Sequence, residues 1–151
     1  MIRQAPHDPA LLARLRVPAV PSSLRLVRRV VRESALIAGA PEAWADDLVL
    51  AVDEACQNVV RHGYAGGSGD LVVTLSRSPA GDGVVTEILD FAPPVDPARV
   101  RGRDLNDVRP GGLGVHFIEA LCEEAGFAEP PEGAGNLFRM VKRFAKADDE
   151  G

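Results

Sequence analysis

The amino-acid sequence predicts an α+β fold, a two-layer α/β sandwich in which helices cover one face of a mostly antiparallel sheet. Two segments, 22–39 and 41–62, repeat apolar residues at the spacing of amphipathic helices. Two runs rich in β-branched residues, 71–76 and 83–90, follow one another across a short connection that contains proline and glycine. Such a pair is typical of an antiparallel hairpin. Because the helical segments are separated in sequence from these strands, helices and sheet are expected to form separate layers.

The first half of the chain is expected to contain one strand and two helices. The strand is predicted at 14–20, where a partly alternating segment is closed by prolines. The first helix begins at hydroxyl N-cap candidates and ends near Gly39. The second helix has Pro41 in its first turn, where proline is tolerated, and stops at Gly63.

The second half continues, after the hairpin, with a long loop, a third helix and a final strand. The segment 91–112 is rich in proline and glycine and shows little periodicity. Loops of this length in a compact domain are usually functional or disordered. The third helix is predicted at 113–126, ending at Gly126, and the final strand at 135–144.

Length and composition favour one globular domain. A chain of 151 residues, of which 46% are hydrophobic and 26% charged, can bury one substantial core. The domain is predicted at 14–145, between an N-terminal extension at 1–13 and a polar tail at 146–151. No apolar run approaches the roughly 18 residues of a membrane span, and the N-terminus lacks the apolar core of a signal peptide. A cytoplasmic protein without a membrane partner is therefore expected.

The charge distribution argues against nucleic acid as a direct partner. The chain has 17 Lys and Arg against 22 Asp and Glu, a net charge of −5, and no basic stripe interleaved with aromatic residues. The segment 14–32 departs from this balance, since it is rich in arginine and holds no acid. This segment could receive an acidic protein, or it could be a solvated helix face.

Glu54 and Asn58 form the first candidate site. They lie four residues apart in the second predicted helix, at the border of an apolar arc that contains Leu48, Val52 and Cys56. Residues at this spacing lie one above the other on a helix. In a cleft, a carboxylate can act as a general base and a carboxamide oxygen can help to bind a hard cation such as Mg²⁺. Taken alone, the pair could equally be an exposed feature of an ordinary helix.

Two further segments carry candidate ligand-binding residues. Gly111, Gly112, Leu113 and Gly114 stand directly before the third predicted helix. Glycines let a backbone approach a ligand closely, and a helix N-terminus presents unpaired N–H groups to an anion such as phosphate. Asp90 ends an apolar strand at the start of the long loop, where a carboxylate can accept a hydrogen bond from the amino group of a purine.

In this order and spacing, the three motifs resemble those of the GHKL (Bergerat-fold) ATP-binding family, and within it the small anti-sigma-factor serine/threonine kinases. The N-box pattern of that family, E-x-x-x-N on a helix, matches "EACQN" from Glu54 to Asn58, and the small-kinase ending matches through His62 and Tyr64. The second glycine box, which opens a helix, matches "GGLGVHFIEAL". The first glycine box, D-x-G-x-G, is matched only at its aspartate, because "DFAPP" has alanine and proline where the family has glycines.

The resemblance implies a kinase that binds Mg-ATP and phosphorylates a serine or threonine of an anti-sigma-factor antagonist of the STAS type. It implies that Glu54 takes the proton of the attacking hydroxyl, that Asn58 holds Mg²⁺ and that Asp90 meets the adenine amino group. The backbone of Gly111, Gly112, Leu113 and Gly114 would cradle the phosphates, under a lid formed by the preceding loop with its candidate arginines Arg101, Arg103 and Arg109.

A sigma factor or a protein of a response-regulator pathway would be the second partner, and pairing into a homodimer is left open. The alternative is a nucleotide-gated binding protein that regulates its partner without transferring phosphate. The incomplete first glycine box keeps that alternative open, because bulkier residues there restrict how closely the backbone can approach a nucleotide.

Overall fold

The structure is a computed structural model that describes residues 8–65, 67–94 and 114–145. One antiparallel sheet contains its strands in the order β1-β2-β3-β5-β4. The strands are β1 (Leu11–Pro18), β2 (Asp70–Arg77), β3 (Gly83–Asp90), β4 (Glu124–Ala128) and β5 (Asn136–Arg143). The α-helices are α1 (Leu24–Ile37), α2 (Glu42–Asn58) and α4 (Gly114–Leu121), with a 3-10 turn η1 (Pro21–Ser23) and a π-helical turn η2 (Val59–Gly63).

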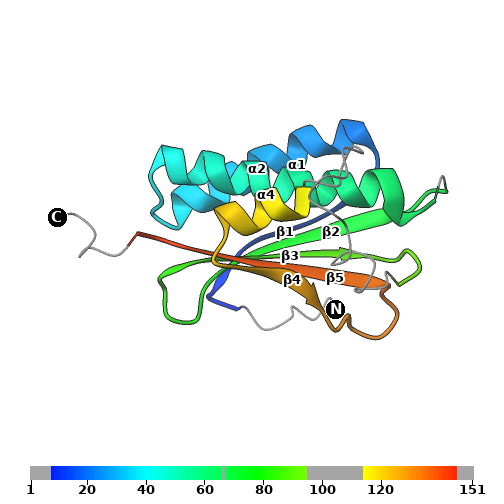
Figure 1. The fold of residues 1–151 in the computed structure, drawn as a ribbon. Coiled ribbons are helices and arrows are strands. Elements are labelled where there is room, and N and C mark those ends of the chain that lie inside the picture. The colour runs from blue at the N-terminus through cyan, green and yellow to red at the C-terminus, as the bar shows by residue number, and fades with distance from the viewer. Residues whose placement is uncertain (1–7, 66, 95–113, 146–151) are drawn as a thin grey trace, which may run out of the picture.

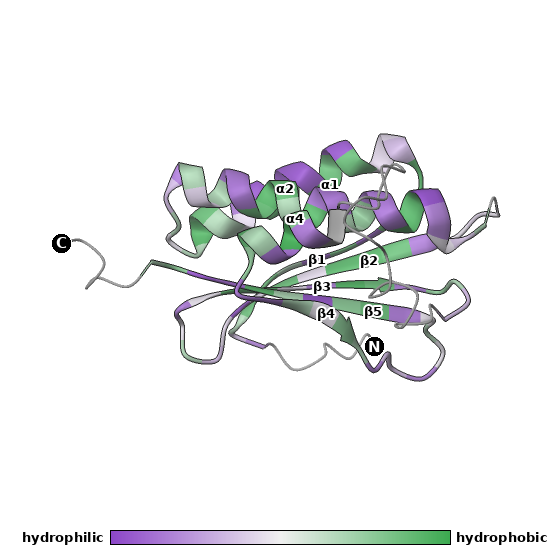
Figure 2. Ribbon diagram, viewed as in Figure 1, coloured by the Kyte–Doolittle hydropathy of each residue, from purple (hydrophilic) through white to green (hydrophobic). Residues whose placement is uncertain are grey.

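The three α-helices of the described residues lie over one face of the sheet, so the predicted α+β two-layer sandwich is confirmed (Figure 1). The core fills the space between the layers, and the helices turn their hydrophobic sides toward the sheet (Figure 2). Fully buried members include Val27 and Val31 of α1, Leu48 and Val52 of α2, and Ile88 of β3. Within the described part of the chain, no helix has the length and apolar character needed to cross a membrane.

The end of α1 follows from one glycine. Gly39 has a φ of 99°, a left-handed conformation that glycine adopts without strain. The amide of Gly39 donates to the Leu36 carbonyl and the amide of Ala40 donates to the Ala35 carbonyl, both at 3.0 Å. These two bonds form a Schellman cap, which satisfies the last carbonyls of the helix and turns the chain toward α2.

The prediction of one helix across 113–126 is wrong in its second half. The helix α4 ends at Leu121, and the following residues form the edge strand β4, which pairs with β5. Two contacts from β5 explain the early end. The ammonium of Lys142 donates to the Leu121 carbonyl at 2.8 Å, and Phe127 packs edge-on against Phe138 with ring centroids 5.2 Å apart. Strand pairing therefore overrides the helical periodicity of this segment.

Candidate active site

Glu54 and Asn58 lie on one side of α2, and both are partly buried. The Oδ1 atom of Asn58 is buried from solvent and has no hydrogen-bond partner among the described residues. A buried polar atom without a partner costs about 1–3 kcal/mol, so most such atoms in folded proteins find one. A bound cation, or a hydrogen-bond donor of a ligand, would satisfy this acceptor oxygen.

The two neighbouring carboxylates on α2 have different surroundings. Asp53 accepts from the Arg28 guanidinium at 2.9 Å and from the Gln57 amide at 2.6 Å, and Gln57 in turn accepts from Arg61. Asp53 is thereby held in a network that joins α1 to α2. Glu54 makes no hydrogen bond or ion pair with any described residue. Of the two, Glu54 is the carboxylate whose oxygens are available to a substrate proton.

The few protein oxygens at this site suit a cation whose other ligands are water molecules and the phosphates of a substrate. The described residues contain no cluster of three or more His, Cys, Asp or Glu side chains that could hold a metal. Magnesium commonly keeps several waters and binds through one or two protein oxygens plus the phosphates of its substrate. The unpartnered Oδ1 of Asn58 fits that role, and Asn58 is the residue that would hold Mg²⁺ here.

A π-helical turn follows Asn58 directly and leads to Tyr64. Such turns are rare and occur frequently at functional sites. The Tyr64 hydroxyl donates to the Asp70 carbonyl at the start of β2 and accepts from the amide of Phe91, just after β3, at 2.9 Å. The Tyr64 ring fills the space that a side chain at position 69 would need, since a Cβ added to Gly69 would lie 2.1 Å from a ring carbon. Tyr64 therefore fixes the end of the α2 segment to the end of the strand that carries Asp90.

Asp90 is buried, 5% exposed, at the end of β3. Its Oδ1 accepts from the amide of Ala92 and from the side-chain amide of Asn136, both at 3.0 Å. Burial raises the pKa of the Asp90 carboxyl above 3.8, and these two hydrogen bonds oppose the rise. Both donors reach Oδ1, and none of the described residues is recorded as donating to Oδ2.

Asn136 was not predicted as a site residue. Its side-chain amide also donates to the Pro93 carbonyl at 3.1 Å, so Asn136 ties the loop after β3 to the start of β5. The register that places Asn136 opposite Asp90 comes from the β3–β5 pairing. The only signal in the sequence is a Gly-Asn pair at the start of a strand, which alone does not reveal its partner.

Ala92 and Pro94, which stand where the first glycine box has glycines, differ in burial. Ala92 is buried, 2% exposed, and its methyl group is covered by protein. A Cβ added to Gly135 would lie 1.7 Å from the Ala92 carbonyl oxygen, and one added to Gly63 would lie 3.8 Å from the Ala92 methyl group. The loop after β3 therefore packs closely against Gly135, and it also contacts the segment at Gly63. Pro94 is exposed at the end of a described range.

The phosphate-binding segment can be placed only in part. Gly114 begins α4, whereas Gly111, Gly112 and Leu113 lie outside the described residues, as do the candidate lid arginines Arg101, Arg103 and Arg109. The C-terminal end of α2, the C-terminal end of β3 and the N-terminal end of α4 all point to the same side of the molecule, at the right of Figure 1. The ends of α2 and β3, which carry Asn58 and Asp90, and the start of α4 at Gly114 thus face the same side of the sandwich.

Comparison with known proteins identifies the family of the chain. The sequence matches the histidine kinase-like ATPase domain over residues 17–142. The chain belongs to the histidine kinase-like ATPase family. The resemblance drawn from the N-box and the second glycine box is thereby confirmed at the level of the family, and a kinase-like ATPase domain is what this chain contains.

The chain is also similar to two individual proteins. The chain is 24% identical to the serine-protein kinase RsbW of Staphylococcus aureus, in an alignment that covers 85% of this chain and 86% of the relative. Its fold is similar to a crystal structure of the RsbU and RsbW domains of Rv1364c from Mycobacterium tuberculosis, with a TM-score of 0.55 and 21% identity. That match covers 87% of this chain but 32% of the other, and at this identity it shows the fold alone.

Proposed function

We propose that the protein is an ATP-dependent serine/threonine kinase of the anti-sigma-factor type, which phosphorylates an anti-sigma-factor antagonist of the STAS type and regulates transcription by exchanging partners. The family and the similarity to a serine-protein kinase support nucleotide chemistry. Mg-ATP, the acceptor protein and the sigma factor or response-regulator pathway protein held in the other state are parts of this proposal.

The observation that carries the proposal is the state of two side chains one helical turn apart. Asn58 presents a buried acceptor oxygen without a partner, and Glu54 has no ion pair or hydrogen bond with any described residue. A helix surface selected for stability alone would pair or replace the Asn58 oxygen, since a buried unpaired polar atom destabilises the fold. Its retention favours a ligand that supplies the missing partner.

The proposed chemistry assigns one task to each residue. Magnesium, when bound, neutralises charge on the phosphates. Asn58 supplies a neutral oxygen ligand that holds the metal in place, and Asp90 accepts the adenine amino hydrogen. Glu54 takes the proton of the acceptor hydroxyl. The hydroxyl oxygen then forms a bond to the γ-phosphorus while the bond from that phosphorus to the leaving ADP oxygen breaks. The backbone of Gly111, Gly112, Leu113 and Gly114 donates to phosphate oxygens.

Titration calorimetry with ATP, with and without Mg²⁺, tests the nucleotide site. We expect magnesium-dependent binding to the native protein and loss of that dependence in Asn58→Ala. Transfer is then tested with γ-labelled ATP and purified STAS-domain proteins, where Glu54→Gln should bind nucleotide and label no acceptor. Nucleotide affinity that is unchanged in Asn58→Ala would exclude the metal assignment.

A nucleotide-gated regulator that transfers no phosphate is the second candidate function. The observation in its favour is the loop after β3, where Ala92 and Pro94 replace glycines and Asn136 bonds to Pro93. This loop is more restricted than a glycine-containing one. ATP that changes partner affinity while no phosphoserine or phosphothreonine forms would select this function over the kinase.

A further inference from the structure

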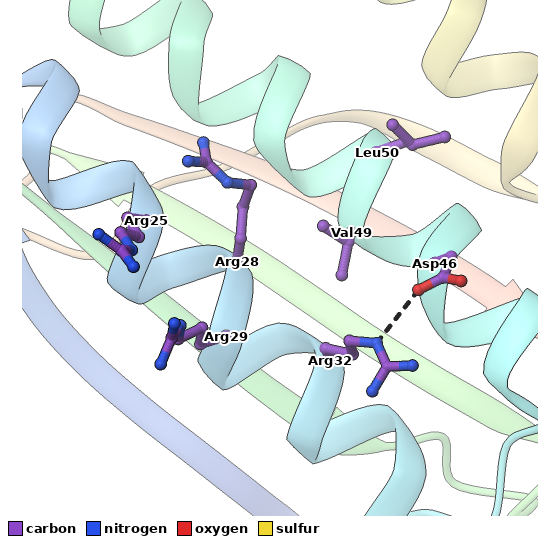
Figure 3. A pocket seen from close by; sticks show the side chains of 7 residues that line it. All are labelled: Arg25, Arg28, Arg29, Arg32, Asp46, Val49 and Leu50. Carbon is purple, nitrogen blue, oxygen red and sulfur yellow. Dashed lines mark hydrogen bonds and ion pairs between the residues drawn. The ribbon is translucent and has the colours of Figure 1, made fainter.

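A groove runs between α1 and α2 and is lined largely by arginine (Figure 3). It encloses about 390 Å³. Arg25, Arg28, Arg29 and Arg32 of α1 form one side. None of the residues that line it is a predicted site residue, so the groove is distinct from the candidate active site.

The four arginines differ in whether their charge is already matched. Arg28 pairs with Asp53 at 2.9 Å and Arg32 pairs with Asp46 at 3.1 Å. Arg25 and Arg29 are exposed, lie one turn apart, and form no ion pair or hydrogen bond with any described residue. The groove therefore has two guanidinium groups free to receive carboxylates, on a chain whose net charge is −5.

The opposite side of the groove is formed by Val49, Leu50 and Asp46 of α2, and the Asp46 carboxylate is the partner of Arg32. Val49 is partly buried and Leu50 is 49% exposed, so the α2 side offers apolar surface to a partner. Leu50 also precedes Glu54 by one turn of α2. Because the Asp46 charge is already matched by Arg32, the groove presents apolar surface from α2 beside the two unmatched positive charges of α1, which suits an amphipathic helix laid along it.

We propose that this groove binds an acidic amphipathic helix of a partner protein. Carboxylates of that helix pair with Arg25 and Arg29, and an apolar side chain of the helix covers Leu50 and Val49. A single-stranded nucleic acid is disfavoured because no aromatic side chain lines the groove for bases to stack on. A flat lipid surface would meet the exposed arginines but not the concave wall. The inference goes beyond the proposed kinase activity and does not depend on nucleotide binding.

The test uses the full chain and a fluorescein-labelled peptide of about 18 residues, long enough to form a helix. The peptide carries Glu at positions i and i+4 and Leu on the adjoining face, and a scrambled peptide of equal charge is its control. Fluorescence anisotropy measures affinity for the native protein, for Arg25→Glu with Arg29→Glu, and for Leu50→Ala. Arg139→Glu with Arg14→Glu is the matched control, since it makes the same charge change on exposed arginines of the sheet.

We expect the ordered peptide to bind and the Arg25→Glu, Arg29→Glu protein to lose about tenfold or more in affinity, because two attractive pairs become repulsive. Leu50→Ala should weaken binding of the ordered peptide without changing the response to salt. The control protein should bind like the native one, and circular dichroism should show all variants folded.

Three results would overturn the proposal. The first is absence of binding by the ordered peptide at millimolar concentration. The second is an equal loss of peptide affinity in the Arg139→Glu, Arg14→Glu control protein, which would assign the effect to net charge. The third is Arg25- and Arg29-dependent binding to phosphatidylserine vesicles or duplex DNA in place of the peptide. Failure of nucleotide binding leaves this result unaffected, because every measurement is made without ATP.

Discussion

We propose different roles for the two adjacent carboxylates of α2, since Asp53 stabilises the fold and Glu54 takes part in the chemistry. Asp53 is 18% exposed in its side chain and takes part in the Arg28–Gln57 network, whereas Glu54 has no partner among the described residues. We expect Asp53→Asn to lower the free energy of unfolding by about 1 kcal/mol, because the pair with Arg28 is partly exposed. The same variant should retain phosphotransfer.

Glu54→Gln is expected to have the opposite effects. It keeps the size of the side chain and removes only the ability to take a proton, so stability should stay within about 0.5 kcal/mol of native while transfer falls about 10²–10⁴-fold. Urea denaturation and labelled-phosphate transfer measure the two properties in the same preparations. Loss of transfer in Asp53→Asn together with full transfer in Glu54→Gln would reverse the assignment.

Asp90→Asn tests the proposed base recognition through stability and pH. Since burial raises the Asp90 pKa above 3.8, the folded protein holds the proton more tightly than the unfolded chain. The stability that this group contributes is therefore fully present below 3.8 and is lost as the pH rises through the raised pKa. At pH 7, Asp90→Asn should be as stable as the native protein or more so, because its Oδ1 can still accept from Ala92 and Asn136.

Binding should respond to the same substitution in the other direction. In Asp90→Asn, the side-chain amide nitrogen would take the place of Oδ2 and face the adenine amino group, which sets two donors against each other. We expect ATP affinity to fall by about tenfold or more in this variant, and native affinity to fall as the pH drops through the raised pKa. Calorimetry across the acid range measures both, and native-like ATP affinity in the variant would exclude Asp90 from base recognition.

At the scale of elements, the contact between β5 and the loop after β3 determines the position of Asp90. A Cβ at Gly135 would lie 1.7 Å from the Ala92 carbonyl oxygen, and the Gly135 amide donates to the Asp90 carbonyl at 2.8 Å. Gly135→Ala must therefore displace the loop, and we expect a loss of about 1–3 kcal/mol in unfolding free energy. Gly126→Ala is the control on the neighbouring strand, since nothing lies within 4 Å of its added Cβ. Equal stability of the two variants would contradict the close contact.

The elements also show which parts of the fold a single sequence reveals. The helices α1 and α2 and the β2–β3 hairpin were predicted because their apolar periodicity and their glycine and proline boundaries are local signals. The strand β4 was missed because 124–128 continues a helical apolar pattern and becomes a strand only through pairing with β5. The connection from β4 to β5 at 129–135 contains two prolines and two glycines, a hairpin signal of the same kind, which the prediction of a continuous helix left unused.

The same distinction applies to the candidate site of the whole molecule. Glu54, Asn58 and Asp90 were identified from motifs, and the fold brings their elements to one end of the sandwich. Asn136 and the bridging hydroxyl of Tyr64 were not, because their roles depend on strand register and on a side chain that spans 27 residues of sequence to reach Phe91. Residues that touch a ligand can follow a motif, whereas those that position them depend on tertiary contacts.

Stability of the whole molecule should reveal whether Asn58 is kept for a ligand. In Asn58→Ala the unpartnered Oδ1 is gone and a better helix former replaces asparagine, so without nucleotide the variant should be more stable than the native protein by about 1 kcal/mol. With Mg-ATP at about 100 times its Kd, the native protein should gain about 2.7 kcal/mol and the variant much less. Thermal unfolding of both proteins, with and without Mg-ATP, should therefore give a reversed order of Tm. A variant that is less stable in both conditions would mean that Asn58 supports the fold, and that its oxygen is not reserved for a cation.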